Sequence, residues 1–305
     1  MCIRDRHLLL VGVAVGLVVI TMLALARLPA PTDDWGQGCT VLNPQLQEAA
    51  DPGDVMLVDM RAYADHFGLA TSLLDCYKAA PVYWGWARQE PVSAERQGQL
   101  AALGREHGGL WLLLEATADA DPASTTERWL EENAYHIGKG WLSPAMRLVR
   151  YHWPAGEPGQ DAQSPLNLRV GERVMLDSYG RAGPTEVRAG EVLALSLFWR
   201  ALQPVEADYV TFVQLLDAGG GLRAQLDRVP LGGFHPTSGW SAGEEIRDNV
   251  GLELPQDLEP GDYQLIAGLY SPASMERLPV STPEGQTLGD YAPLAVIRIV
   301  GSEGP

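Results

Sequence analysis

The hydrophobic pattern of the chain begins with an uninterrupted apolar run from Leu8 to Ala26, in which Thr21 alone carries a polar side chain. At about 1.5 Å rise per residue, a helix of this length spans roughly 28 Å, which is close to the hydrocarbon thickness of a bilayer. The run therefore predicts a transmembrane helix over residues 7–28. A cleaved signal peptide is the alternative, because small residues near the end of the run offer a cleavage site.

Short apolar runs alternate with helical patterns between residues 39 and 154. Ser93 is placed to cap a helix that extends to Glu106, and Ser124 and Glu127 have the spacing of a capping box that opens a helix ending near Gly138. Another helix is expected over residues 63–77. Strands are expected at VMLVD (55–59), PVYWGW (81–86), GLWLLLE (109–115) and MRLVRYHW (146–153). This order predicts a small three-layer α/β domain over residues 39–154, with GLWLLLE in the middle of a parallel sheet.

The pattern changes after residue 165, where strand-length runs follow one another without a capped helix between them. Val192 to Trp199 is apolar on both faces, which predicts a central strand covered by the opposite sheet on one side and by the α/β domain on the other. Residues 166–301 are therefore expected to form an antiparallel β-sandwich of seven to nine strands. The expected strands are 174–179, 192–200, 209–216, 222–229, 250–254, 263–270 and 294–300.

Two segments rich in proline and glycine divide the chain. PAPTDDWGQG predicts a linker over residues 29–38, and PAGEPGQDAQSP predicts a second linker over residues 155–165. The run Gly219 to Gly221 is expected to be a hairpin turn, since no Lys-Ser or Lys-Thr follows as in a phosphate loop. The fold class is thus an α+β multidomain, membrane-anchored chain.

Charge excludes one class of partner and suggests an orientation. With 22 basic and 39 acidic residues the formal net charge is −17, so nucleic acid is not expected as a partner. Arg4 and Arg6 precede the apolar run and most acidic residues follow it, which places the N-terminus in the cytoplasm and residues 29–305 outside the cytoplasmic membrane. The opening MCIRDR is typical of translated adapter remnants in metagenomic reading frames, so residues 1–6 are interpreted as a non-native leader and the chain as a fragment.

The cysteines are consistent with an exported domain. Cys2 lies in the leader, whereas Cys39 and Cys76 form an even pair in the region placed outside the cytoplasm. A disulfide between Cys39 and Cys76 is one expectation. The alternative is two independent thiols, with Cys76 packed as a small apolar residue on a helix face.

Motifs for catalysis or cofactor binding are not found. The sequence contains neither CxxC nor HExxH, and the α/β half lacks GxSxG, so no metal, cofactor or catalytic residue is assigned. Asp59, at the end of an expected strand, is the carboxylate best placed for function, although a turn or capping role is the simpler interpretation. The same two interpretations apply to Arg61 and His66 nearby. Gly12 and Gly16 form a weak GxxxG signal for contact between membrane helices.

Aromatic side chains gather in the loop LGGFHPTSGWSAGEE. It contains Phe234, His235 and Trp240, and Tyr270 and Asp248 are expected nearby. Rings beside polar groups can stack on sugars, which makes these residues candidates for weak carbohydrate binding. The alternative is that Phe234 and Trp240 anchor the loop on the sandwich edge.

Taken in order, several segments resemble the C-terminal end of multispanning bacterial glycosyltransferases of the dolichyl-phosphate-mannose:protein mannosyltransferase and aminoarabinose-transferase-like superfamily. The resemblance begins with the last membrane helix. It continues through PTDDWGQG, PGDVMLVDM, GLWLLLEATADADPASTTERWLEENAY, YVTFVQLLD, PTSGW, GEEIRDN and PGDYQLIAGLYSPASMERLPV.

The resemblance implies that the intact protein transfers a sugar from a polyprenyl-phosphate donor, while this part is a non-catalytic extracytoplasmic region. The acidic catalytic and metal-binding residues of that superfamily lie in an early extracytoplasmic loop, so no position here matches them. Expected partners are the bilayer through residues 8–26, other membrane helices of the parent protein, and a glycan. The alternatives are a complete single-pass protein with exported glycan- or protein-binding domains, and an extracytoplasmic hydrolase.

Overall fold

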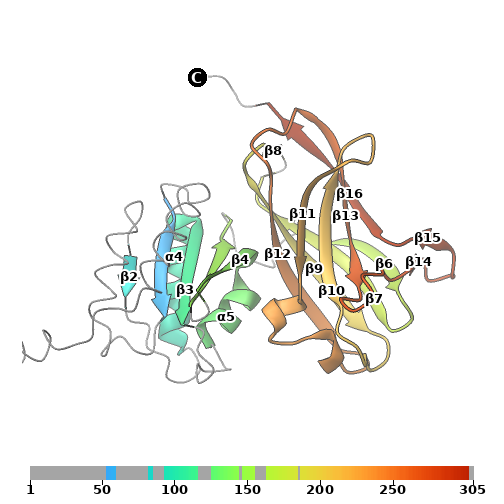
Figure 1. The fold of residues 1–305 in the computed structure, drawn as a ribbon, viewed down its shortest axis with the longest axis horizontal. Coiled ribbons are helices and arrows are strands. Elements are labelled where there is room, and N and C mark those ends of the chain that lie inside the picture. Colours follow the sequence, from blue (N-terminus) through green and yellow to red (C-terminus); the bar gives the residue numbers. More distant parts are fainter. Residues whose placement is uncertain are drawn as a thin grey trace, which may run out of the picture.

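The computed structural model describes residues 53–59, 82–84, 93–115, 125–143, 146–154, 163–184 and 186–301. A smaller α/β half and a larger β half lie side by side (Figure 1). No helix within these ranges is long and apolar enough to cross a membrane. Several predictions fall outside the described residues: the helix at 7–28 with Gly12 and Gly16, the linker at 29–38, Cys39 and Cys76, Arg61, and the helix at 63–77 with His66.

The first half has a mixed sheet. Its strands are β1 (Val55–Asp59), β2 (Val82–Trp84), β3 (Gly109–Glu115), β4 (Tyr135–Ser143) and β5 (Met146–His152). Strand β1 pairs in parallel with both β2 and β3, whereas β5 pairs antiparallel with β3 and β4. The expected position of GLWLLLE in the middle of a parallel sheet is therefore wrong, because β3 has one parallel and one antiparallel neighbour.

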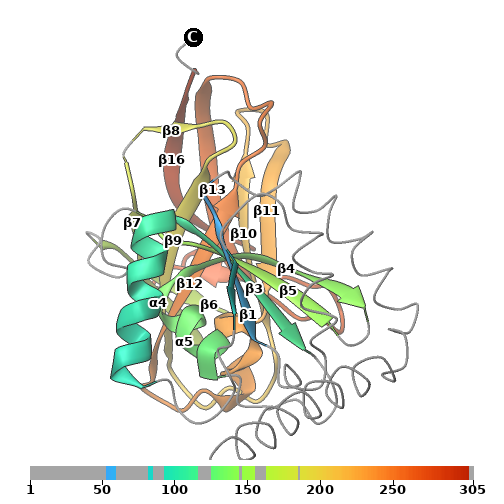
Figure 2. The same ribbon diagram turned by 90° about the vertical axis from the view of Figure 1, so that its left-hand side faces the viewer.

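Among the described residues, two helices cover one face of this sheet: α4 (Ala94–His107) and α5 (Thr125–Asn133). The Ser93 hydroxyl accepts a hydrogen bond from the Arg96 amide at 3.3 Å, which confirms the expected N-cap. Leu100 of α4 and Leu130 of α5 pack into one buried cluster with side chains of β1, β3 and β5. Figure 2 shows both helices on one side of these strands, to their left. Helix α5 ends at Asn133, so the expected extension to Gly138 is wrong, and β4 takes its place.

The β half contains two sheets that pack across a common core. Strands of the first are β6 (Ser164–Val170), β7 (Val174–Ala182), β9 (Val192–Ala201), β12 (Glu245–Glu253), β14 (Val280–Ser281) and β15 (Thr287–Gly289). The second has the order β11-β10-β13-β16-β8, namely β11 (Leu222–Arg228), β10 (Val210–Leu216), β13 (Gly261–Tyr270), β16 (Ala292–Val300) and β8 (Val187–Arg188). The β-sandwich-like character is confirmed, although β8 pairs with β16 in parallel.

Strand β9 is central, as its apolar pattern predicts, and lies between β7 and β12. Leu195 and Leu197 point into the sandwich core, while Ser196 is buried on the opposite face. There the Ser196 hydroxyl lies 3.4 Å from the hydroxyl of Tyr135 on β4. The α/β half thus covers the second face of β9 at this position.

The hairpin between β10 and β11 turns at the glycine run. The Asp217 carboxylate accepts hydrogen bonds from the backbone N–H groups of Gly219 and Gly221, at 2.9 and 2.8 Å. Gly220 has φ of 80°, a conformation that favours glycine. This confirms the predicted turn.

A single sheet runs through both halves. Strand β4 pairs in parallel with β12 at His136 and Val250, which joins five strands of the first half to six of the second among the described residues. Residues 155–162 of the expected linker lie outside the described residues, and β6 begins at Ser164, within the bounds expected for the linker. The two halves are consequently connected through backbone pairing as well as through the chain.

Candidate functional site

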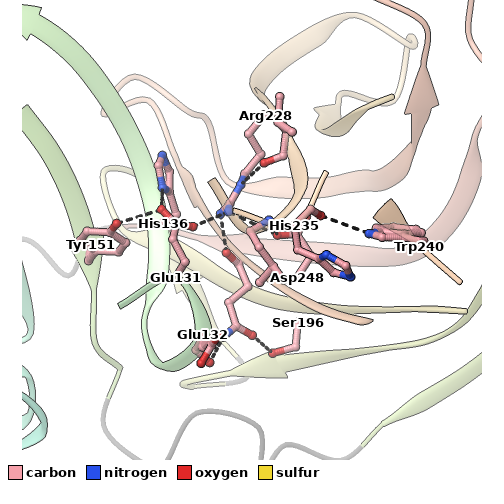
Figure 3. Close-up of polar contacts among 12 residues, drawn as sticks. Glu131, Glu132, His136, Tyr151, Ser196, Arg228, His235, Trp240 and Asp248 are labelled. Carbon is pink, nitrogen blue, oxygen red and sulfur yellow. Dashed lines mark hydrogen bonds and ion pairs between the residues drawn. The ribbon is translucent and has the colours of Figure 1, made fainter. Parts of the chain in front are cut away.

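Three charged side chains meet where the two halves join. Glu131 comes from α5, Arg228 from the end of β11 and Asp248 from the middle of β12 (Figure 3). Their side chains are at most 4% exposed. Since β11 is the edge strand of the five-stranded sheet and β12 lies between β9 and β4 in the other sheet, this cluster fills the junction between both sheets and α5.

The Arg228 guanidinium uses its donors on several partners at once. It forms an ion pair and hydrogen bond with Glu131, lies 3.4 Å from Asp248, and donates to the Asn249 carbonyl at 2.8 Å. Although burial opposes the charged form, Asp248 and Glu131 raise the pKa of Arg228. A buried guanidinium with this many acceptors is fixed in position and charge.

Glu131 is the centre of the network. One carboxylate oxygen contacts Arg228, and the other lies 2.7 Å from His136 Nδ1 and accepts a hydrogen bond from Tyr151 at 2.8 Å. Burial alone would raise the pKa of Glu131, but Arg228 and His136, with the hydrogen bonds from His136 and Tyr151, hold that pKa well below its ordinary value. Burial and then the Glu131 charge raise the pKa of Tyr151. Glu131 is therefore an anion and Tyr151 a neutral phenol across the usual pH range.

The sandwich also caps the end of α5. The carbonyl of Glu132, in the last turn of the helix, accepts hydrogen bonds from Asn249 at 3.0 Å and from Arg247 at 2.5 Å. Such carbonyls lack partners within a helix, and a cation beside them also offsets the helix dipole. Asn249 is held in turn by Ser196, whose hydroxyl donates to it at 2.9 Å.

A loop with strained backbone conformations contacts this network. The turn η1 (Pro230–Gly233) contains Leu231 with φ of 50° and Gly232 with φ of 65°. The Leu231 amide donates to the Asp248 carboxylate at 3.1 Å, which holds a conformation that non-glycine residues rarely adopt. A Cβ atom at Gly232 would lie 2.8 Å from the Glu131 carboxyl carbon, so glycine permits the loop to approach α5.

The loop and α5 enclose a cavity of about 200 Å³. Arg128 lies over the Phe234 ring, with its guanidinium carbon 5.3 Å from the ring centroid. His235 Nε2 lies 2.7 Å from the Glu244 carboxylate. The backbone N–H of Ser241 chiefly, and then His235, lower the pKa of Glu244. The cavity is lined by Arg128, Glu131, Glu132, Leu231, Phe234 and His235.

The structure separates the four residues expected to bind carbohydrate. Phe234 and His235 are partly buried and line one cavity, and Asp248 lies beneath their loop as expected. Trp240 is only 1% exposed, and its indole donates to the His235 carbonyl at 3.1 Å. Its ring is not available for stacking on a sugar, so this expectation is corrected: Trp240 anchors the loop in the core. Tyr270 lies on the second sheet and contacts Phe212 instead.

Another polar site lies in the α/β half, where Asp54 precedes β1. The buried Asp54 carboxylate accepts a hydrogen bond from Trp111 at 2.9 Å and lies 3.7 Å from Arg150, which also binds Glu253 of β12 at 2.5 Å. These contacts border a cavity of about 760 Å³ between the halves. Asp59 forms the end of β1, as expected. Within the described residues, no group of three His, Cys, Asp or Glu side chains is arranged to hold a metal.

Sequence reasoning missed two charged residues of the junction and identified only Asp248 as a neighbour of the aromatic loop. Glu131 and Arg228 are separated by 97 positions, and neither stands in a recognisable motif. One local signal was present: Asp248 interrupts the inward-facing positions of β12, which are otherwise apolar at Ile246, Val250 and Leu252. A carboxylate at such a position requires a buried partner.

Comparisons with known proteins leave the family open. No family model and no curated protein matches the chain. Among solved structures, the C-terminal domain of wzt is 13% identical with a TM-score of 0.27, over 48% of this chain and 81% of that one. A β-glucosidase from Listeria innocua is 15% identical with a TM-score of 0.25, over 50% of this chain and 18% of that one. These similarities are too weak to carry a functional argument.

Proposed function

We propose that this chain is the non-catalytic, extracytoplasmic C-terminal region of a membrane glycosyltransferase that uses a polyprenyl-phosphate-linked sugar donor. Residues 8–26 anchor it in the cytoplasmic membrane beside other membrane helices of the parent protein. Its contribution is a weak glycan contact made by the loop at residues 231–235. The resemblance of the sequence segments supports the first part of the proposal, and the geometry of the loop supports the last.

The observation that carries the glycan contact is the rigid support beneath Phe234 and His235. Asp248 holds the backbone of Leu231, and the saturated network around Glu131 fixes the helix on the other side of the cavity. An aromatic ring that is already held in place loses little entropy when a ligand binds. Phe234 offers an apolar surface for a sugar ring, and Glu132 and His235 offer hydrogen-bonding groups for its hydroxyls.

The buried carboxylates at this cavity favour a structural role over hydrolysis. A glycosidase acid must carry a proton near the working pH, which requires a raised pKa. The pKa of Glu131 is shifted in the opposite direction by Arg228 and His136. Glu131 and Asp248 also share Arg228, so each already has a cationic partner. The hydrolase alternative would therefore need carboxylates from elsewhere in the chain.

The test is glycan binding by the full chain in detergent micelles, titrated against a panel of polysaccharides. Phe234→Ala should weaken binding several-fold while the melting temperature stays within a few degrees, because the ring is only partly buried. Trp240→Ala serves as the contrast: removal of this buried indole should destabilise the fold by about 3–5 kcal/mol.

The same preparation should neither transfer nor hydrolyse sugars. Turnover of a glycoside by the chain alone would contradict the non-catalytic assignment. Equal polysaccharide affinity of the wild type and Phe234→Ala would remove the loop as the contact. Protease added outside intact cells should digest residues 38–305, and their protection would reverse the proposed topology.

A further inference from the structure

The outer face of the five-stranded sheet carries a second polar and aromatic cluster. Three strands place Asp227 of β11, Phe212 of β10 and Gly268 of β13 in one row, since Phe212 pairs with both of the others. Residues on these strands alternate, and their neighbours Val213, Ala267 and Leu269 point into the core. The row therefore faces away from the core. None of its residues lines the cavity beside Phe234.

Gly268 allows Phe212 to lie across the sheet. A Cβ atom at position 268 would lie 2.5 Å from Cζ of Phe212, so the ring occupies the space that a side chain would take. Arg277 lies over the ring, with its guanidinium carbon 4.2 Å from the centroid, and donates to the side-chain amide oxygen of Gln214 at 2.9 Å. Phe212 is only 1% exposed, and its ring supports the Arg277 guanidinium through a cation–π contact.

A cavity of about 210 Å³ lies beside the Phe212 ring. It is lined by Phe212, Gln214, Asp227, Tyr270, Met275 and Arg277. Met275 is 70% exposed and has φ of 59°, a strained conformation that the turn after β13 imposes. Tyr270 packs beside Phe212, with ring centroids 6.5 Å apart. The wall of the cavity thus combines an aromatic ring and a thioether with a carboxylate, an amide and a guanidinium.

Two of these polar groups are still available for a ligand. Among the described residues, the Asp227 carboxylate and the Tyr270 hydroxyl form no side-chain hydrogen bond or ion pair. Although the Asp227 side chain is exposed, neighbouring groups shield it enough to raise its pKa, and Arg277 only partly opposes this. A carboxylate that has lost part of its hydration gains from hydroxyl donors.

We propose that this cavity, built by Tyr270, Asp227, Arg277 and Met275 on Phe212, binds a single neutral sugar ring. The apolar face of the ring packs on Tyr270 and Met275, while Asp227 accepts from its hydroxyls and Arg277 donates to them. An anionic ligand fits less well, because Asp227 stands beside Arg277 and the chain carries a net charge of −17. At about 210 Å³ the cavity is smaller than typical ligand pockets, which limits the occupant to about one ring.

The site is separate from the loop at residues 231–235 and does not depend on sugar binding there. Saturation-transfer NMR suits weak binding, and the probes are methyl glycosides of mannose, glucose, galactose and N-acetylglucosamine added to the full chain in micelles. At least one probe should give saturation transfer. Asp227→Asn and Tyr270→Ala should each weaken its binding about tenfold or more.

Asp262→Asn is the matched control, since Asp262 lies on the same face of β13 but outside the cavity, in an exposed pair with Arg298. Asp262→Asn should leave methyl glycoside binding unchanged. Melting curves verify that each variant is folded, and Asp227→Asn provides the decisive comparison because its side chain is exposed.

Three outcomes would overturn the inference: no probe binds, Asp227→Asn and Tyr270→Ala both bind as the wild type does, or inorganic phosphate displaces the glycoside. If methyl glycosides do not bind but Phe234→Ala still lowers polysaccharide affinity, this inference fails while the proposed function stands. The reverse result would place sugar recognition on the five-stranded sheet alone.

Discussion

Similar side chains have different roles at the junction of the two halves and on the outer face of the five-stranded sheet. Arg228 lies between Glu131 and Asp248 and donates to the protein in several directions, with 4% of its side chain exposed. Arg277 lies on Phe212, donates to Gln214, and stands beside an exposed Asp227. Burial favours pairing within the protein, and among the described residues only one oxygen of the buried trio, Asp248 Oδ2, forms no hydrogen bond. Partial exposure, by contrast, leaves groups that a ligand can use.

The largest effect should follow from removing the cation at the junction. Arg228→Met leaves Glu131 and Asp248 buried without their partner, and we expect a loss of about 3–5 kcal/mol in the free energy of unfolding. Urea denaturation of the full chain, followed by tryptophan fluorescence, measures it. Arg298→Met removes an exposed ion pair with Asp262 and should change stability by less than about 1 kcal/mol.

The double variant Arg228→Met with Glu131→Gln sharpens this test. If the cost arises from an unpaired buried charge, neutralising Glu131 should recover part of it, although Asp248 remains unpaired. Equal stability of Arg228→Met and Arg298→Met would mean that the buried pair contributes no more than the exposed one.

A smaller effect should come from filling the space under Phe212. Gly268→Ala places a methyl group against the ring and should destabilise the chain by about 1–3 kcal/mol. Because Arg277 stacks on Phe212, the substitution should also weaken methyl glycoside binding. Gly98→Ala is the control: no atom lies within 4 Å of the added Cβ, and alanine should stabilise helix α4 by up to about 1 kcal/mol.

Local sequence patterns predicted most strands but not the contacts between them. GLWLLLE and VMLVD form strands over the expected residues, because continuous β-branched and apolar runs suit a sheet buried on both faces. Strand β4 was missed because YHIGKGWLS contains two glycines and a lysine and follows a helix directly. Strand β6 was missed because Pro165 and the polar residues before it suggested a linker.

The candidate sites were harder to predict for a physical reason. The aromatic loop could be seen in the sequence, but burial separates Trp240 from Phe234, and only the packed core determines which ring is exposed. Tyr270 was associated with that loop, yet strand pairing places it beside Phe212. Because register and sheet order depend on contacts between distant segments, one sequence does not reveal which faces meet.

The smallest effect should appear only in acid solution. It tests whether the buried, ionised Glu131 contributes to stability as its contacts imply. The folded-state pKa of Glu131 lies below its ordinary value of 4.5, so the unfolded chain binds a proton more readily there than the native chain does. This contribution to stability is therefore fully present above about pH 4.5 and is lost as the pH falls toward the folded-state pKa. Thermal melts below pH 4.5 should show a shallower pH dependence for Glu131→Gln than for the wild type. Glu244, whose pKa is lowered mainly by the Ser241 amide, is partly exposed, so Glu244→Gln should change that dependence less and salt should reduce its effect. If Glu131→Gln and Glu244→Gln reduce the pH dependence of the melting temperature equally, the buried charge of the junction contributes no more to stability in acid than a partly exposed charge does.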